Sequence, residues 1–174
     1  MTTVQDATKE PPSTVIINGY TLLSEAGRGA MGLLYAALRP GTGEVVAFKV
    51  AFSGHEHRLA GEAAFLSALE GCSVVPQIYE VRCGELTWLA MEMLYGEDLY
   101  TAVTNSPDKR FPPLRCLAIA IQICEGLVFM HGRGILHRDI KPENIFLAYR
   151  TEGERVKILD FGIATHVDQQ TWSL

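Results

Sequence analysis

Short apolar stretches separated by turn residues make up the first half of the chain, from Val15 to Leu94. Such stretches, roughly four to eight residues long and bounded by glycine, proline or polar residues, are typical of β-strands. The turn Pro40-Gly41-Thr42-Gly43 predicts a hairpin. We therefore expect five strands, at residues 20–23, 33–38, 45–50, 74–81 and 87–94.

Two longer segments carry the spacing of amphipathic helices. From Glu56 to Leu69, apolar residues recur at three- and four-residue intervals, at Leu59, Ala63, Leu66 and Leu69. The segment from Pro113 to His131 has a broader apolar face and is followed by glycines. That face consists of Leu114, Leu117, Ala118, Ile121, Cys124, Leu127 and Val128. A short helix from Asp98 to Val103 is also predicted, so the chain combines a strand-rich first half with a mainly helical continuation.

Composition then narrows the class of protein. Of the 174 residues, 48% are hydrophobic and 20% are charged, which is typical of a globular domain with a real core. The formal net charge of −5 provides no basic surface, so nucleic acid and anionic membranes are not expected partners.

The N-terminus and the cysteines indicate a cytoplasmic protein. Residues 1–14 contain charged residues and a Pro-Pro pair but no apolar core, so we expect a disordered segment rather than a signal peptide. The four cysteines form no C-x-x-C pair, which favours reduced, mostly buried thiols. The uncharged run from Cys116 to Cys124 is too short to span a bilayer, so no membrane segment is expected.

Gly27, Gly29 and Gly32 form a G-x-G-x-x-G pattern between two predicted strands. Alone the pattern is weak, because it also describes a flexible hairpin tip. A dinucleotide-binding loop requires a helix after the glycines and an acid about 20 positions later. Here a strand-like run follows and residue 49 is a lysine, which excludes that interpretation. Backbone N–H groups that can approach phosphates, with an ammonium on the next strand, fit a nucleotide phosphate site instead.

Lys49 is the one polar residue within 46–50, so we expect it in a sheltered cleft rather than on the surface of a strand. A sheltered ammonium needs a carboxylate partner. Glu62 lies beside the apolar stripe of the first helix and is the best candidate, because Glu56 and Glu70 lie nearer the helix ends. The alternative is that Glu62 is an ordinary exposed glutamate.

Residues 137–144, with the sequence HRDIKPEN, place an acid, a base and an amide close together. Asp139 could accept a hydroxyl proton, Lys141 could steady a phosphoryl group, and Asn144 could bind a metal through its carbonyl oxygen. Pro142 prevents the segment from being a continuous helix. This combination predicts a catalytic loop.

A further acidic motif follows a predicted strand at residues 156–159. Asp160 is followed by Phe161 and Gly162. An acid at a strand end beside a glycine suits Mg²⁺ that bridges phosphates, because Mg²⁺ takes few carboxylates in addition to phosphate oxygens. Phe161 is expected to pack inward as a hinge.

Taken in order, from Tyr20 to Ala164, these motifs resemble those of the protein kinases. The strand Val46-Ala47-Phe48-Lys49 is similar to the family's V-A-I-K strand, and Glu62 falls on its helix-C glutamate. Residues 141–144 resemble serine/threonine rather than tyrosine kinases. Residues 29–32 and 161–164 are most similar to the bacterial, eukaryotic-like branch.

The resemblance implies a role for each matching residue. The implied catalytic residues are Asp139 as the base, Lys141, Lys49 and Glu62. The implied Mg²⁺ ligands are Asn144 and Asp160. In the ATP site, Met91 would be the gatekeeper, with the Glu92 carbonyl and Leu94 N–H at the adenine edge. The full implied ATP-binding set is Gly27, Gly29, Gly32, Leu34, Ala47, Lys49, Met91, Glu92, Leu94, Asp98 at the ribose, and Phe146 beneath the base.

The same resemblance implies an α+β, protein-kinase-like fold. Residues 15–94 would form a five-stranded antiparallel N-lobe with helix C, and residues 95–174 an incomplete, mainly helical C-lobe. The implied function is transfer of the ATP γ-phosphate to serine or threonine hydroxyls of a protein substrate.

The end of the chain departs from the family pattern. Only residues 163–174 follow the Asp160-Phe161-Gly162 motif, whereas kinase domains run to roughly 250 residues. We therefore expect an exposed apolar face on the 113–131 helix, to be covered by a partner or a further segment, and poor phosphotransfer by this chain. One alternative is a non-catalytic ATP-binding or interaction module. A small-molecule phosphotransferase is less compatible with residues 137–144.

Overall fold

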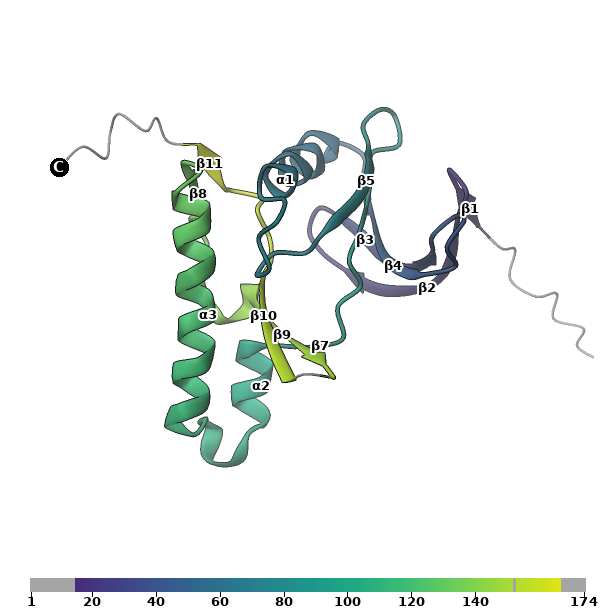
Figure 1. The fold of residues 1–174 in the computed structure, drawn as a ribbon. Coiled ribbons are helices and arrows are strands. Elements are labelled where there is room, and N and C mark those ends of the chain that lie inside the picture. The colour runs from purple at the N-terminus through teal and green to yellow at the C-terminus, as the bar shows by residue number, and fades with distance from the viewer. Residues whose placement is uncertain (1–14, 152, 167–174) are drawn as a thin grey trace, which may run out of the picture.

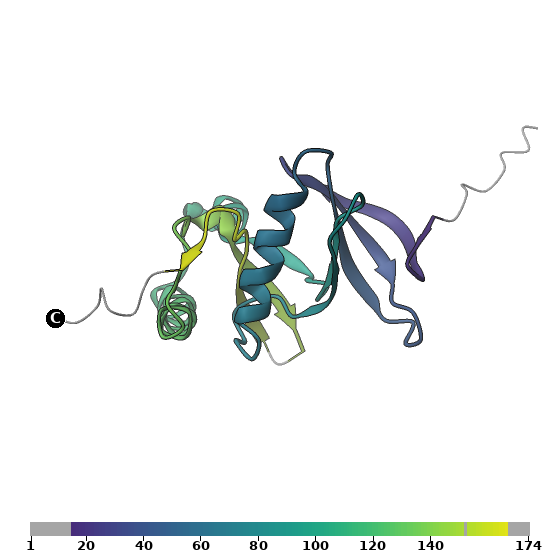
Figure 2. The same ribbon diagram turned by 90° about the horizontal axis from the view of Figure 1, so that it is seen from above.

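The computed structural model describes residues 15–151 and 153–166. Figure 1 shows a curled sheet with helix α1 (Glu56–Ala68) and a second part dominated by helix α3 (Pro113–His131). Seen from above, α1 lies between the sheet and α3 (Figure 2). The predicted α+β organisation is confirmed.

Six antiparallel strands form the sheet, in the order β1-β2-β3-β4-β6-β5. They are β1 (Ile16–Ile17), β2 (Tyr20–Arg28), β3 (Gly32–Leu38), β4 (Val45–Ala51), β5 (Ile78–Arg82) and β6 (Trp88–Met91). The sheet thus has one strand more than the five predicted. The extra strand is β1, whose two residues are too few for an alternating pattern to be recognised. The turn Asn18-Gly19, with φ angles of 50° and 85°, joins it to β2 as a tight hairpin.

Side chains hold the two edges of this curled sheet together. Asn18 Nδ2 donates to Glu80 Oε1 and the Tyr20 hydroxyl donates to Glu80 Oε2, each over 3.0 Å. Arg82 also donates to Asn18 Oδ1 over 3.1 Å. Because these residues come from opposite edges of the sheet, the hydrogen bonds stabilise its curled shape.

Helix α1 buries the side that the sequence predicts. All four residues of its apolar stripe are buried, namely Leu59, Ala63, Leu66 and Leu69. They pack in one core with residues of α3 and of the strands that follow it, including Met130, Leu147 and Ile158. This packing fixes α1 between the two parts of the molecule.

The strand predicted for residues 74–81 is wrong over its first four residues, because β5 begins only at Ile78. Val74, Val75 and Pro76 are instead buried in an irregular segment. Pro76 has no N–H to donate to a strand ladder, which explains the late start. The Val74 carbonyl accepts a hydrogen bond from Ile158 N over 2.7 Å, so this segment is held by the second part of the molecule. The strand predicted for 87–94 likewise ends early, at Met91.

The second part contains two small sheets. β7 (Gly96–Asp98), β9 (Ile145–Arg150) and β10 (Gly153–Ile158) form one, in the order β10-β9-β7. β8 (Ile135–Leu136) and β11 (Thr165–His166) form the other. Because β8 precedes residues 137–144 and β11 follows residues 159–164, this pairing brings the two predicted active segments close together. The short helix η2 (Pro142–Asn144) lies within the first of them.

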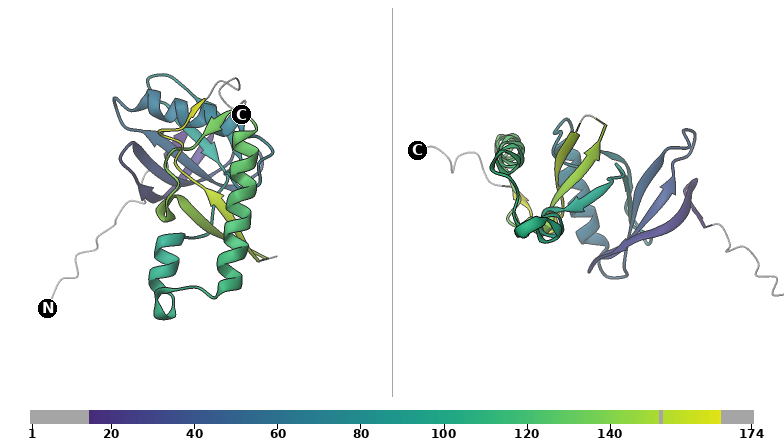
Figure 3. Two further views of the ribbon diagram at one scale, coloured as in Figure 1. Left: turned by 90° about the vertical axis from the view of Figure 1, so that its left-hand side faces the viewer. Right: turned by 90° about the horizontal axis from the view of Figure 1, so that it is seen from below.

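The connection from α2 (Leu99–Asn105) through η1 (Pro107–Lys109) to α3 lies at the end of the molecule farthest from the large sheet (Figure 3). Helix α2 is the short helix predicted after Asp98, and it extends two residues further than expected. Asp98 caps it by accepting a hydrogen bond from Thr101 N over 2.8 Å.

Helix α3 has the predicted bounds, and its broad apolar face is exposed, as the sequence predicts. Its buried residues are Ile119, Gly126 and Met130. The predicted apolar face is largely exposed, with Leu114 80% and Val128 72% accessible. The reason is that the described elements contact α3 from one side only, mainly through β8 and β10.

By length and composition, α3 is the one helix among residues 15–151 and 153–166 that could cross a membrane. One such helix is weak support for a membrane span, because core helices of water-soluble proteins pass the same test. Here Arg115 near its start forms two hydrogen bonds to Glu154 of β10, of 2.6 and 3.3 Å, so the helix is tied to the small sheet.

Candidate active site

A cavity of about 350 Å³ lies between the large sheet and the segments that follow α3. The walls come from the β2–β3 hairpin, β4, α1 and β6 on one side, and from residues 143–144 and 159–161 on the other. Nine residues of the predicted site line it: Gly27, Gly29, Gly32, Leu34, Lys49, Glu62, Met91, Asn144 and Asp160. Motifs that are far apart in the sequence therefore meet in one place.

The glycines of the hairpin serve different purposes. At Gly32 a Cβ would lie 2.1 Å from the Val50 carbonyl oxygen, so only glycine allows β3 to pair with β4 there. At Gly29 a Cβ would meet nothing within 4 Å. The space over Gly29 is thus open for a group from solution, and the exposed backbone of the hairpin faces it.

Lys49 and Glu62 form the ion pair that the sequence predicts. Lys49 Nζ on β4 donates to Glu62 Oε2 on α1 over 2.6 Å. Glu62 is only 4% exposed, so the alternative of an ordinary surface glutamate is wrong. Burial makes the pair a firm link between the sheet and α1, with the ammonium at the cavity wall.

Asp139 is the centre of a hydrogen-bond network. Its Oδ2 accepts from Lys141 Nζ over 2.7 Å and from Asn144 Nδ2 over 2.8 Å, and its backbone carbonyl accepts from the same amide over 2.9 Å. The hydrogen bond from Lys141, followed by that from Asn144, holds the pKa of Asp139 below its ordinary value. Asp139 is therefore ionised at neutral pH and fixed beside Asn144.

His137 links the segment of residues 137–144 to the segment of residues 159–162. The ring is 2% exposed, its Nδ1 accepts a hydrogen bond from Asp139 N over 3.2 Å, and its Nε2 lies 2.9 Å from the Leu159 carbonyl oxygen. An acceptor role for Nδ1 places the proton of the neutral ring on Nε2, which then donates to Leu159. Burial lowers the pKa of His137, so the ring stays neutral.

The Asp160-Phe161-Gly162 turn exposes the acid and buries the ring. Asp160 has a positive φ of 62°, which is unusual for a residue other than glycine. This conformation directs the carboxylate into the cavity, while Phe161 is 1% exposed and packs edge-on against His137 with ring centroids 4.7 Å apart. The predicted inward packing of Phe161 is confirmed.

Two oxygen donors that suit a magnesium ion line the same cavity. Asn144 uses its amide nitrogen to bind Asp139, so its carbonyl oxygen is left for another partner. Asp160 uses Oδ1 to accept from Gly162 N over 3.1 Å. Among the described residues no three His, Cys, Asp or Glu side chains cluster as a metal site. Two protein donors agree with Mg²⁺, which completes its shell with water and phosphate oxygens.

The other residues predicted for the base and ribose, which are Ala47, Glu92, Leu94, Asp98 and Phe146, do not line the cavity. Ala47 is buried on β4 opposite Met91, and Phe146 lies on β9 opposite Asp98. Desolvation would raise the pKa of Asp98, but hydrogen bonds from the Thr101 N–H and hydroxyl outweigh it and hold the pKa below its ordinary value. The ribose role of Asp98 stays a prediction, since its carboxylate also caps α2.

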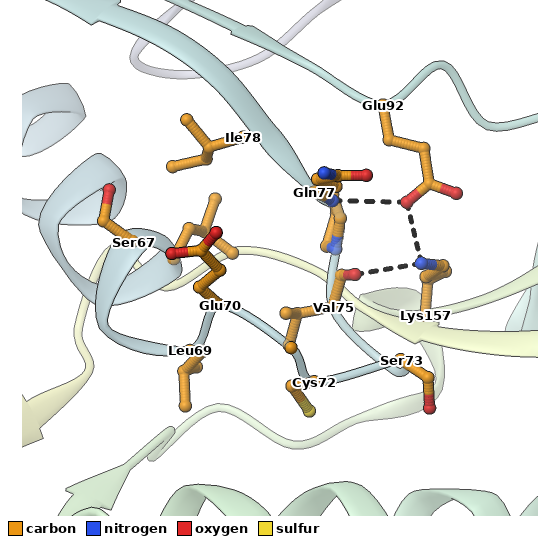
Figure 4. A pocket seen from close by; sticks show the side chains of 13 residues that line it. Ser67, Leu69, Glu70, Cys72, Ser73, Val75, Gln77, Ile78, Glu92 and Lys157 are labelled. Atoms are coloured by element: carbon orange, nitrogen blue, oxygen red, sulfur yellow. Dashed lines mark hydrogen bonds and ion pairs between the residues drawn. The ribbon is translucent and has the colours of Figure 1, made fainter.

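A buried ion pair behind the cavity escapes sequence reasoning. Lys157 Nζ donates to Glu92 Oε2 over 2.7 Å and to the Val75 carbonyl over 2.9 Å, as Figure 4 shows. Gln77 N also donates to Glu92 Oε2, over 3.2 Å. The Glu92 side chain thus points away from the predicted adenine edge and fixes the connection after β6. The one signal in the sequence is a lysine with apolar neighbours on both sides, Val156 and Ile158.

The ion pair borders a second, larger cavity of about 620 Å³ (Figure 4). The end of α1, the segment around Cys72 and the start of β5 form its other walls. Leu66 and Pro76 line both cavities, so they form the partition between them. None of the predicted catalytic or metal-binding residues faces this second cavity.

Comparison with known proteins agrees with this geometry. The family described as Protein kinase domain matches residues 20–173. The chain is 38% identical over 164 residues to the serine/threonine-protein kinase pkn2 of Myxococcus xanthus, which covers 91% of this chain and 19% of that protein. It is 27% identical over 161 residues to the serine/threonine-protein kinase DCLK2 of Homo sapiens, covering 90% of this chain and 21% of the relative. The chain thus spans about a fifth of the length of these relatives.

Proposed function

This chain belongs to the protein kinase family, and we propose that it carries the nucleotide-handling part of a bacterial-type serine/threonine protein kinase. The reaction would transfer the γ-phosphate of ATP to a serine or threonine hydroxyl of a protein substrate. One observation carries the proposal: the Lys49–Glu62 pair, Asn144 and Asp160 line one cavity, next to the network around Asp139. Each position suits one part of phosphoryl transfer.

ATP would bind with its base between β6 and β9 and its phosphates beneath the β2–β3 hairpin. Leu34 and Met91 provide apolar contacts on the cavity wall. The open space over Gly29 admits phosphates to the backbone N–H groups, and Lys49 supplies a positive charge that Glu62 holds in place. The Glu92 carbonyl, Leu94 N–H, Ala47, Asp98 and Phe146 are proposed for the base and ribose.

The residues present fit a magnesium ion, which would be held by the Asn144 carbonyl oxygen and the Asp160 carboxylate. When bound, Mg²⁺ neutralises phosphate charge and orients the transferring group. The chain's own contribution is positional: Asn144 is fixed by Asp139, and Asp160 is fixed by its unusual backbone conformation.

Asp139 is the proposed base. Its carboxylate is ionised because Lys141 and Asn144 hold its pKa low, so it can accept the hydrogen bond of a substrate hydroxyl and orient the oxygen for attack. Lys141, which is exposed and bonded to the same carboxylate, can exchange that bond for one to the transferring phosphoryl group.

A second candidate function rests on a different observation. The exposed apolar face of α3 favours a non-catalytic nucleotide-binding or interaction module until a further segment or a partner covers it. The proposed compartment is the cytoplasm, where the four free thiols would stay reduced. The expectation that they are mostly buried is wrong: Cys72 is buried, whereas Cys83, Cys116 and Cys124 are exposed.

The decisive experiment measures binding and turnover separately. Isothermal titration with ATP and Mg²⁺ tests the nucleotide site, and transfer of radiolabelled phosphate to a generic basic protein tests catalysis, with Asp139→Asn as the comparison. We expect ATP binding in both chains and loss of any turnover in the variant. Absence of ATP binding would overturn the proposal, while binding without turnover in the parent chain would favour the module.

A further inference from the structure

Met31 lies at the tip of the β2–β3 hairpin and lines the proposed nucleotide cavity. Its side chain packs beside Gly162: a Cβ built on Gly162 would lie 3.0 Å from Met31 Cε and 3.7 Å from Sδ. The same point lies 3.0 Å from Asp160 Oδ1. The thioether therefore fills the space next to Gly162 and lies close to the Asp160 carboxylate.

This contact joins the hairpin to the turn that carries Asp160, across the mouth of the cavity. Gly29 and Ala30, at the tip, are exposed, whereas Gly32 is buried against β4. Backbone hydrogen bonds from Phe52 N to the Met31 carbonyl, 2.9 Å, and from Gly29 N to the Gly32 carbonyl, 3.0 Å, hold the base of the tip, and the Met31 side chain links the hairpin to the Asp160 turn. Met31 itself is partly exposed, which allows a small oxidant to reach its sulfur. By contrast, Met130 is fully buried in the core.

We propose that Met31 is an oxidation site, at which conversion to the sulfoxide releases the hairpin from the Asp160 turn and weakens nucleotide binding. The effect on nucleotide rests on the proposed function. The oxidant is hydrogen peroxide: the Sδ lone pair attacks one peroxide oxygen, and the S–O bond forms as the O–O bond breaks. The leaving hydroxide takes the proton from the oxygen now bound to sulfur, which gives water and the neutral sulfoxide. Sulfur is oxidised by two electrons and the peroxide is reduced.

The physical reason lies in what surrounds the sulfur. Sulfoxidation turns an apolar group into a polar one that carries a hydrogen-bond acceptor oxygen. The tight packing beside Gly162 leaves little room for an added oxygen. The partial negative charge on that oxygen would also lie near the Asp160 carboxylate and the proposed phosphate positions, which are negatively charged. An attractive contact thereby becomes a repulsive one.

Met91 is the competing site, because it too lines the cavity and is partly exposed. The experiment therefore compares the parent chain with Met31→Leu and Met91→Leu, each before and after mild hydrogen peroxide. Leucine keeps an apolar side chain of similar volume but has no sulfur to oxidise. Each variant is compared with its own untreated form, so differences in starting affinity do not matter.

We expect peroxide to weaken ATP–Mg²⁺ binding about fivefold or more in the parent chain and in Met91→Leu, but not in Met31→Leu. Treatment with methionine sulfoxide reductases A and B should restore the parent, since each reduces one epimer. The inference is overturned if Met31→Leu loses affinity as the parent does, or if Met91→Leu is the protected variant.

A readout without nucleotide separates this inference from the proposed function. Hydrogen exchange followed by mass spectrometry should show faster exchange in residues 27–34 after oxidation of the parent chain, and no change in Met31→Leu. Peptide mapping should show Met31 oxidised before Met130. If the untreated chain binds no ATP, the proposed function fails; if exchange stays the same or Met31 resists peroxide, the oxidation site fails.

Discussion

Two ion pairs of similar length flank the cavity, and they differ in their exposure to water. Lys49 and Glu62 are 2.6 Å apart with side chains 20% and 5% exposed, whereas Lys141 and Asp139 are 2.7 Å apart with side chains 46% and 31% exposed. Solvent screens the second pair and leaves the first largely unscreened. Lys49–Glu62 can therefore hold structure, while Lys141 is free to change partner.

Replacing Lys49 by methionine should destabilise the chain by about 3 kcal/mol, because the Glu62 carboxylate would remain buried without a partner. Lys141→Met is the matched control and should change the free energy of unfolding far less, because solvent screens the exposed Lys141–Asp139 pair. Urea denaturation at pH 7 measures both. Equal losses would mean that burial does not distinguish the two pairs.

His137 makes stability depend on pH. Burial lowers its folded pKa below the ordinary value of about 6.5, so at lower pH the unfolded chain binds more protons than the folded one. Stability should therefore fall as the pH drops below about 6.5 towards the folded pKa. The loss should be smaller in His137→Gln, which does not titrate. Urea unfolding between pH 8 and pH 5 checks this, and parallel curves for the two chains would contradict it.

At the scale of elements, α3 approaches the irregular segment before β5 through a single small residue. A Cβ on Gly126 would lie 2.1 Å from Val74 Cγ2 and 3.5 Å from Ile158 Cδ1. Glycine is thus required by packing and not by backbone conformation. The close approach sets the distance between α3 and the loop that follows α1.

Gly126→Ala should therefore destabilise the chain by about 1–3 kcal/mol through overpacking, despite the better helix propensity of alanine. Gly61→Ala in α1 is the matched control, because a Cβ there meets nothing within 4 Å. That variant should be stabilised by up to about 1 kcal/mol. Shifts of the same sign in the two urea midpoints would contradict the packing argument.

At the scale of the molecule, the exposed side of α3 is the largest departure from a finished core. Apolar side chains such as Leu114 and Val128 face water there, together with Leu117 and Ile121. Because these side chains are exposed, they add no hydrophobic stabilisation to the fold of the described residues. They would contribute only on association with another surface.

The double variant Leu114→Gln and Val128→Gln should accordingly leave the urea midpoint nearly unchanged and reduce self-association in sedimentation velocity. Ile119→Ala, on the buried side of the same helix, should cost about 2–5 kcal/mol. A large loss of stability in the double variant would show that this side is covered in the free chain.

Much of the architecture is predictable because it rests on local patterns. The stripe of α1, the bounds of α3, most strands of the large sheet and the inward packing of Phe161 follow from periodicity and turn residues. The unpredicted strand, β1, is too short for such a pattern. The start of β5 depends on where Pro76 interrupts the ladder, and the buried side of α3 depends on which neighbours are present.

The sequence by itself determined which chemical groups this protein carries and their order, because residue types and spacing are local properties. The sequence alone identifies each of these groups: the glycine loop, Lys49, Glu62, the catalytic loop and Asp160. Only the tertiary structure decided their depth and their contacts: the burial of Glu62, the neutral His137 between two segments, the Lys157–Glu92 pair and Met31 against Gly162. These depend on segments distant in the chain, and their strength depends on how far packing removes them from water.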